Sequence, residues 1–189
     1  RFWLVGGVGG GSGAVAARWA ALTDPRGIDV GADGRVYVAD PAASAVFVYT
    51  PDGKMVFTLP QPNLELAPRD VAVDENGDLY VQSRKALLWY TAGETVSRQA
   101  LYLDDLQGVA ILTGNAIYAT RADDARDWHG VVAWAWRPRE GVVAAEWPLL
   151  NYPPGRLNRP HAVHAGADGR IWVLDGWPRV QAFAPDGTP

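Results

Sequence analysis

The sequence predicts an all-β fold, a β-propeller with four visible four-stranded blades, and three observations support this prediction. One residue pattern recurs four times along the 189-residue chain. Within each copy, apolar residues alternate with other residues at period two, as is typical of strands. Gly-containing turn pairs separate these short runs. Because one such sheet cannot bury both of its faces alone, repeated copies are expected to stack.

Each copy of the repeat begins with two short strands. An opening position (25, 68, 106 or 160) is followed twelve residues later by an aromatic residue in every copy. These aromatic residues are Tyr37, Tyr80, Tyr118 and Trp172. The turn pairs between the two strands are Asp33-Gly34, Asn76-Gly77, Gly114-Asn115 and Asp168-Gly169. Because such pairs tolerate positive φ, they predict two-residue hairpin turns.

Two more strands complete each predicted blade. A third strand is expected over residues 46–49, 87–89, 131–136 and 180–183. A fourth is expected over residues 54–59, 96–103 and 142–147. We therefore predict a single domain over residues 1–189, with blades at about 25–60, 68–103, 106–147 and 160–189 plus 1–6.

The repeat resembles the NHL family, in which Pro-x-Gly-Ile/Val-x-Val, an Asp-Gly turn, Val-Tyr-Val-Ala-Asp and a Pro-Asp-Gly turn follow in order. Residues 25–53 match this pattern closely and residues 160–187 match it well, with Trp172 as the aromatic residue. Residues 68–93 match less well, and residues 106–141 match only in part. The resemblance implies a propeller that presents its functional residues at the mouth of a central channel.

Two closures of the ring are compatible with the repeat. Arg1-Phe2-Trp3-Leu4-Val5 has the pattern of a fourth strand for the last blade, and Gly6 to Gly13 then forms a linker. Pairing this strand with the last blade would remove two open sheet edges and close a four-bladed ring. The NHL resemblance instead implies six blades, in which case the chain is an arc of a larger ring.

Composition restricts the classes of function. The net charge of −4 and the lack of a Lys/Arg-rich stripe argue against nucleic-acid binding. No apolar stretch is long enough to span a bilayer, although the domain could belong to a membrane-associated complex. The chain has no cysteine and begins at Arg1, as expected after removal of a targeting segment or for part of a longer polypeptide. The family resemblance and this start together suggest an extracytoplasmic location (periplasmic, secreted or cell-surface).

One face of the predicted disc carries the candidate binding residues. Arg26, Arg69, Gln107 and His161 open the innermost strand of successive blades. They form a ring that could bind an anion, or they cap strand ends. Asp40 and Asp175 follow the second strands and are expected to satisfy backbone donors in turns. Two long irregular segments, 121–130 and 148–159, are expected on the same face, and Trp128 and Trp177 are candidate interface anchors.

The histidines allow a second interpretation. His161, His164 and His129 could ligate a metal, as in NHL-like lyases whose channel histidines come from different blades. In this chain Arg26, Arg69 and Gln107 occupy three of those positions, and His164 is expected to point to the other side of its strand.

The sequence contains no complete acid–base, nucleophile or metal constellation, and no cofactor is expected. We therefore predict a non-catalytic scaffold that presents its loop-bearing face to a protein, peptide or glycan partner. The alternative is a metal-dependent lyase or hydrolase with its site at the channel mouth.

Overall fold

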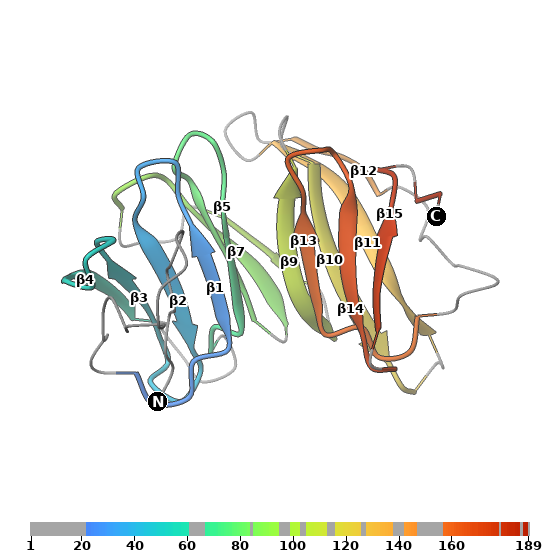
Figure 1. Cartoon of the computed structure of the whole chain (residues 1–189), viewed down its shortest axis with the longest axis horizontal. Coiled ribbons are helices and arrows are strands. Elements are labelled where there is room, and N and C mark those ends of the chain that lie inside the picture. Colours follow the sequence, from blue (N-terminus) through green and yellow to red (C-terminus); the bar gives the residue numbers. More distant parts are fainter. Residues whose placement is uncertain are drawn as a thin grey trace, which may run out of the picture.

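The computed structural model describes residues 22–60, 67–83, 85–94, 99–102, 105–112, 116–125, 128–137, 142–146, 157–177, 179–185 and 187–188. These residues form fifteen strands in four antiparallel sheets, without a helix (Figure 1). In the order of the chain, the four sheets correspond to the four predicted blades. No described segment is a helix of the length and apolarity needed to cross a membrane.

The strands of each sheet follow one another in space as they do in the sequence. The first sheet contains β1 (Gly27–Val30), β2 (Val36–Asp40), β3 (Ala45–Tyr49) and β4 (Met55–Pro60). The second contains β5 (Asp70–Val73), β6 (Leu79–Gln82), β7 (Ala86–Tyr90) and β8 (Gln99–Tyr102). The third contains β9 (Leu106–Leu112), β10 (Ala116–Asp123), β11 (Trp128–Arg137) and β12 (Val142–Glu146). The last contains β13 (Ala162–Ala165), β14 (Ile171–Asp175) and β15 (Arg179–Phe183).

The hairpin turns contain the predicted glycines but are one residue longer than expected. In the first sheet, the amide of Gly31 donates to the carbonyl of Arg35, and Gly34 adopts a φ of 78°. Gly77 and Gly169 occupy the same place in their sheets, with φ values of 80°. The prediction of two-residue turns is therefore wrong for these three hairpins. A three-residue loop that ends in a left-handed glycine joins the strands instead.

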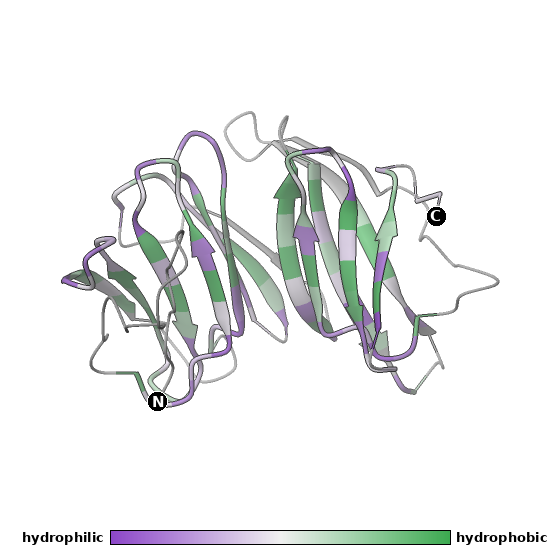
Figure 2. Cartoon of the chain, viewed as in Figure 1, coloured by the Kyte–Doolittle hydropathy of each residue, from purple (hydrophilic) through white to green (hydrophobic). Residues whose placement is uncertain are grey.

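Consecutive sheets stack through apolar faces, and the first strand of each sheet packs against the first strand of the next. β1 lies beside β5, β5 beside β9, and β9 beside β13. Hydrophobic and hydrophilic bands alternate along these strands, as on β1 and β13 in Figure 2. Each of three inter-sheet cores contains one of the predicted aromatic residues, namely Tyr37, Tyr80 and Tyr118. This arrangement confirms the prediction of an all-β fold made of stacked blades.

The hairpin between β10 and β11 corrects one sequence-based prediction. An irregular loop is predicted over residues 121–130, but β10 continues to Asp123 and β11 begins at Trp128, and these two residues are paired. Near the tip of this hairpin, the Nε2 atom of His129 lies 3.0 Å from Oδ1 of Asp124. The hairpin is therefore a regular extension of the third sheet.

Other predicted features lie outside the described residues. These are the N-terminal strand Arg1 to Val5, the glycine-rich segment Gly6 to Gly13, the turn pair Gly114-Asn115 and most of the segment 148–159. Among the described strands, β15 is the outermost strand of the last sheet.

Candidate functional site

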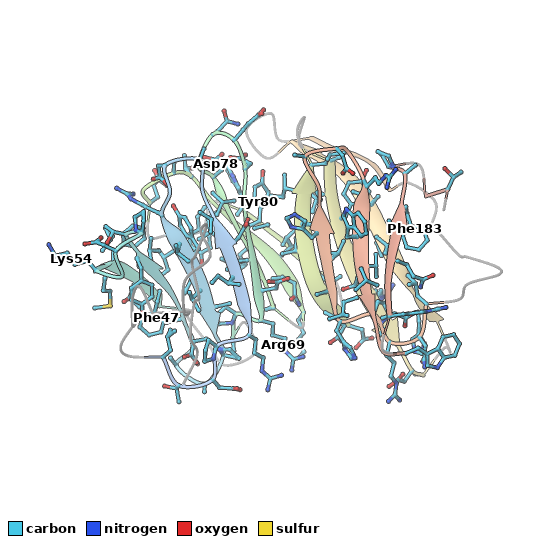
Figure 3. The ribbon with its side chains drawn as sticks, viewed as in Figure 1. Phe47, Lys54, Arg69, Asp78, Tyr80 and Phe183 are labelled. Carbon is cyan, nitrogen blue, oxygen red and sulfur yellow. The ribbon has the colours of Figure 1, made fainter. Side chains whose placement is uncertain are left out.

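The four residues of the predicted ring lie at the same end of successive first strands. The amides of Arg26, Arg69 and His161 donate to equivalent carbonyls of the neighbouring second strand, those of Ala39, Gln82 and Leu174. Gln107 is the second residue of β9 and lies between Arg69 and His161 in this series. Figure 3 shows Arg69 at the end of the second sheet that is lowest in that view.

The side chains of this ring differ in their partners. The guanidinium of Arg26 is bound to Asp24 at 3.1 Å, and Gln107 donates to the carbonyl of Asp105 at 3.4 Å. Both contacts stay within a few residues of the strand end, as expected for capping. His161 is exposed and Arg69 is half-buried. Anion binding by this ring stays a prediction.

The two candidate tryptophans lie on different sheets. Trp128 is the first residue of β11. Trp177 follows β14 and is exposed, and the guanidinium carbon of Arg179 lies 4.8 Å from the centroid of its ring. Their role in binding a partner also stays a prediction.

The structural role predicted for the two buried aspartates is confirmed. Asp40 accepts hydrogen bonds from the amides of Thr23, Asp24 and Ala43. Asp175 accepts from the amide of Asn158 at 2.7 Å and from the side chains of Arg179 and Gln181. Ser83 follows the second strand of the second sheet, and its hydroxyl accepts from the amides of Lys85 and Ala86 and donates to the carbonyl of Ala86.

The histidines do not converge on a metal site. His129 is bound to Asp124, which also forms an ion pair with Arg159 at 3.0 Å. His164 is paired with Trp172 across the hairpin of the last sheet. Within the described ranges, no group of three or more His, Asp or Glu side chains is arranged to hold a metal ion. The described histidines and carboxylates therefore do not form the metal site that the sequence suggested.

A pair of carboxyl groups that sequence analysis missed lies on the first strands. Asp29 of β1 accepts from the amide of Val30 at 2.9 Å and from that of Val73, on the next blade, at 2.7 Å. Asp70 of β5 accepts from its neighbour Val71 at 3.0 Å and from Val109, again on the next blade, at 2.9 Å. Each carboxyl group therefore joins two adjacent blades through otherwise unpaired strand-edge amides.

Glycines on both adjacent blades make room for Asp70. A Cβ atom on Gly27 would lie 2.5 Å from the Cα atom of Asp70, and one on Gly108 would lie 3.2 Å from its Oδ2 atom. Side chains at these two positions would push the neighbouring first strands apart. Acidic residues inside otherwise apolar strands, next to glycines at the equivalent positions of adjacent repeats, are the sequence signal that could have identified this feature.

Burial favours the neutral form of both carboxyl groups in this pair. Burial raises the pKa of Asp70 to about 7, and the nearby Asp29 adds to the rise while the amides of Val109 and Val71 oppose it. Burial also raises the pKa of Asp29, which the amides of Val73 and Val30 partly offset. The charge of His164 lowers the pKa of Asp29 as well and is the smallest of these effects. We call Asp29, Asp70 and His164 the inner-strand site.

Comparison with solved structures identifies the fold of this chain. No family model and no curated protein matches the sequence. A gluconolactonase from Xanthomonas campestris superposes with a TM-score of 0.69 at 18% identity, over 87% of this chain and 60% of that one. A streptogramin B lyase gives a TM-score of 0.57 at 13% identity, over 85% of this chain and 54% of that one. A catalytically inactive virginiamycin B lyase from Staphylococcus aureus, with quinupristin, gives 0.54 at 16% identity, over 85% of this chain and 55% of that one.

These neighbours are β-propeller proteins, which confirms the predicted fold class. The chain spans 54 to 60% of the length of these three structures. The neighbours are also enzymes, a gluconolactonase and lyases. This finding overturns the prediction of a non-catalytic scaffold that presents a loop-bearing face to a partner.

Proposed function

We propose that this chain carries a lactone hydrolase activity, with Asp29 as the general base and His164 as the general acid. The observation that carries the proposal is the inner-strand site, where burial raises the pKa of Asp29 on the first blade and the charge of His164 on the last blade lowers it. The gluconolactonase neighbour supports the substrate class, because it shares the fold at a TM-score of 0.69.

The chemistry requires two proton transfers. A water molecule attacks the carbonyl carbon of the lactone, and the carboxylate of Asp29 takes the proton that this water loses. The ring C–O bond then breaks, and the leaving oxygen takes a proton from His164, the general acid. The product is the open hydroxy acid. One more proton transfer, from Asp29 to His164 through water, restores the starting state.

Asp70 is assigned a positioning role in this scheme. Its carboxyl group lies between Gly27 and Gly108 of the adjacent blades and is more deeply buried than that of Asp29, so it is not placed to touch a substrate. Near neutral pH, protonation of Asp70 removes a negative charge close to Asp29. Asp70 thus tunes the base without contacting the substrate.

A lyase is the second candidate, because two of the superposed enzymes are lyases. In that case Asp29 would remove a proton from carbon rather than from water, and the product would be unsaturated. The two reactions are distinguished by their products. Hydrolysis transfers oxygen from labelled water into the product, whereas elimination gives an ultraviolet-absorbing alkene. For either activity, we also propose that the chain is related to the NHL family, because its repeat resembles that of the family.

The experiment is a pH-stat measurement of glucono-1,5-lactone hydrolysis above the spontaneous rate. Asp29→Asn and His164→Gln should each lower kcat/KM by about 10²–10⁴-fold, the usual contribution of a general acid or base. Asp33→Asn and His129→Gln are matched controls, since Asp33 lies in an exposed turn and His129 is bound to Asp124. Activity of Asp29→Asn within tenfold of the parent chain, with an unchanged circular dichroism spectrum, would contradict the proposal.

A further inference from the structure

One face of the last sheet differs from the equivalent face of every earlier sheet. In the first three sheets this face carries Tyr37, Tyr80 and Tyr118, which are 6%, 1% and 0% exposed. The equivalent residue of the last sheet, Trp172, is 37% exposed. Leu174 and Val180 lie beside it, as the pairing of β14 with β15 shows, and they are 45% and 61% exposed. We call Trp172, Leu174 and Val180 the end face.

The three buried interfaces show how such a face is covered. Tyr37 packs against Val71 and the half-buried Val73, which lie on the first strand of the next blade. Tyr80 meets Val109 and Ile111 in the same way. Tyr118 meets Val163 and Ala165. In each case the partner is a first strand that presents two aliphatic residues at alternate positions.

We propose that the end face is a docking surface for one further propeller blade, whose first strand carries two aliphatic residues at alternate positions. The end face continues the series of three interfaces, because an aromatic residue occupies the same strand position in all four sheets. Each superposed propeller is also longer than the part that this chain covers, 54 to 60% of its length. Exposed apolar patches of this kind mark contact surfaces.

The turn around Gly187 resembles the turn that joins β3 to β4, so an added strand can pair with β15 in the same register. Gly187 has a φ of 87° and its amide donates to the carbonyl of Ala184 at 2.8 Å. Gly53 in the first sheet has a φ of 85° and donates to Thr50 at 2.9 Å. Both glycines belong to a Pro-Asp-Gly turn. A strand placed after Gly187 can therefore pair with β15 as β4 pairs with β3.

This equivalence gives a direct experiment. Residues 54–102, which supply a fourth strand and one complete blade, are fused after Gly187, where they follow the same turn as in the parent chain. Because the chain has no cysteine, a single introduced thiol reports the exposure of one site. Leu174→Cys and Val180→Cys probe the end face. Val56→Cys is the control, since Val56 is 42% exposed on the outer strand β4 of the first sheet.

Maleimide labelling of the two end-face thiols should slow by at least about tenfold in the extended chain, because a covered thiol reacts only when the structure opens. Labelling of Val56→Cys should be unchanged. Equal end-face rates in both chains, together with the added strand content of a folded extra blade, would overturn the proposal.

A second measurement decides the question if the added blade does not fold. In the 189-residue chain, Leu174→Ser and Trp172→Ser should each leave Tm within about 2 °C, as for a surface substitution. Tyr118→Ser, at the buried equivalent position, should lower Tm by far more. If Leu174→Ser lowers Tm as much as Tyr118→Ser, the end face is already covered within this chain and no further blade docks there.

Discussion

At the scale of single residues, Asp29 and Asp70 supply hydrogen-bond acceptors to strand amides between adjacent blades. First strands of adjacent blades lie close together without forming a continuous ladder, so some of their amides need acceptors from elsewhere. Each of these carboxyl groups accepts one amide of its own strand and one of the next blade. The burial that this requires favours the neutral acid, and it raises the pKa values of both groups.

Asp70 should make the stability of the chain depend on pH. Its folded pKa of about 7 lies above the ordinary value of 3.8, so the folded state holds a proton that the unfolded state has lost between these values. The free energy of unfolding should therefore fall as pH rises from about 4 to 7 and then level off. The fall should be on the order of 1–4 kcal/mol, since one pKa unit corresponds to about 1.4 kcal/mol.

Urea unfolding at several pH values measures this dependence. Asp29 and Asp74 have raised pKa values too and contribute with the same sign, so the comparison must be made with a variant. Asp70→Asn should remove most of the slope between pH 5 and 8, values that bracket the folded pKa of about 7. A variant with the slope of the parent chain would show that Asp70 does not titrate in this range.

Gly27 should be intolerant of a side chain. A Cβ atom there would lie 2.5 Å from the Cα atom of Asp70 and 2.9 Å from the carbonyl oxygen of Arg69, and neither backbone can yield without moving β5. Gly27→Ala should lower the free energy of unfolding by about 1–3 kcal/mol. Gly169→Ala is the control, because open space surrounds it and only its φ of 80° opposes the substitution. Chemical denaturation of both variants separates crowding from backbone conformation, and an equal loss in both would rule out crowding.

The sequence predicted some of these residue roles and missed others. Asp40 and Asp175 end a strand before a turn, a local context in which an aspartate caps backbone donors, so their role was predictable. Asp29 and Asp70 bond amides 44 and 39 residues away. Their partners depend on how two blades are placed, and no local pattern encodes that.

At the level of elements, the first, second and last blades are each stabilised where the second strand ends. In the last sheet this place is Asp175, whose buried carboxylate holds Asn158 before β13 and Arg179 at the start of β15. A single side chain therefore joins the entry of the blade to its outer strand.

Loss of this carboxylate should loosen the last blade. Asp175→Ala leaves a buried amide and a guanidinium without their acceptor, and we expect a loss of about 1–3 kcal/mol. Asp168→Ala, in an exposed turn of the same sheet, should change stability by less than about 0.5 kcal/mol. Hydrogen exchange of the Asn158 amide reports the effect locally. Full protection of that amide in Asp175→Ala would contradict this role.

Strand positions were largely predictable because alternation and turn residues act over short distances. The length of the β10–β11 hairpin was not predictable, because residues 121–130 are rich in charged side chains and resemble a solvated loop. In the structure, Asp124 forms a hydrogen bond with His129 near the tip of that hairpin and an ion pair with Arg159. Such pairing allows polar residues to extend a regular sheet.

For the whole molecule, stability is a sum over interfaces between neighbouring blades, as in other repeat proteins. The central interface contains Ile117, which is fully buried between the second and third sheets. The repeat alone predicted this stacking. The inner-strand site could not be predicted in the same way. Asp29 and His164 occupy equivalent positions of the first and last repeats, but Asp70 occupies a different repeat position, and the repeat does not show how close side chains of different blades lie.

Weakening the central interface should separate the chain into two halves that unfold independently. Ile117→Ala should cost about 2–5 kcal/mol, the usual range for a buried aliphatic truncation. We expect fluorescence and circular dichroism to report different denaturation midpoints for this variant, because the tryptophans are unevenly distributed between the halves. Val56→Ala, at an exposed outer position, is the control. Coincident transitions in Ile117→Ala would show that the four sheets remain one cooperative unit.

The bridging carboxyl groups also provide two natural reporters of motion. The amide proton of Val73 is retained only while the first blade stays against the second, and that of Val109 only while the second stays against the third. Isotope exchange at these two amides would therefore time the parting of each junction separately, in the unmodified chain and without an added probe.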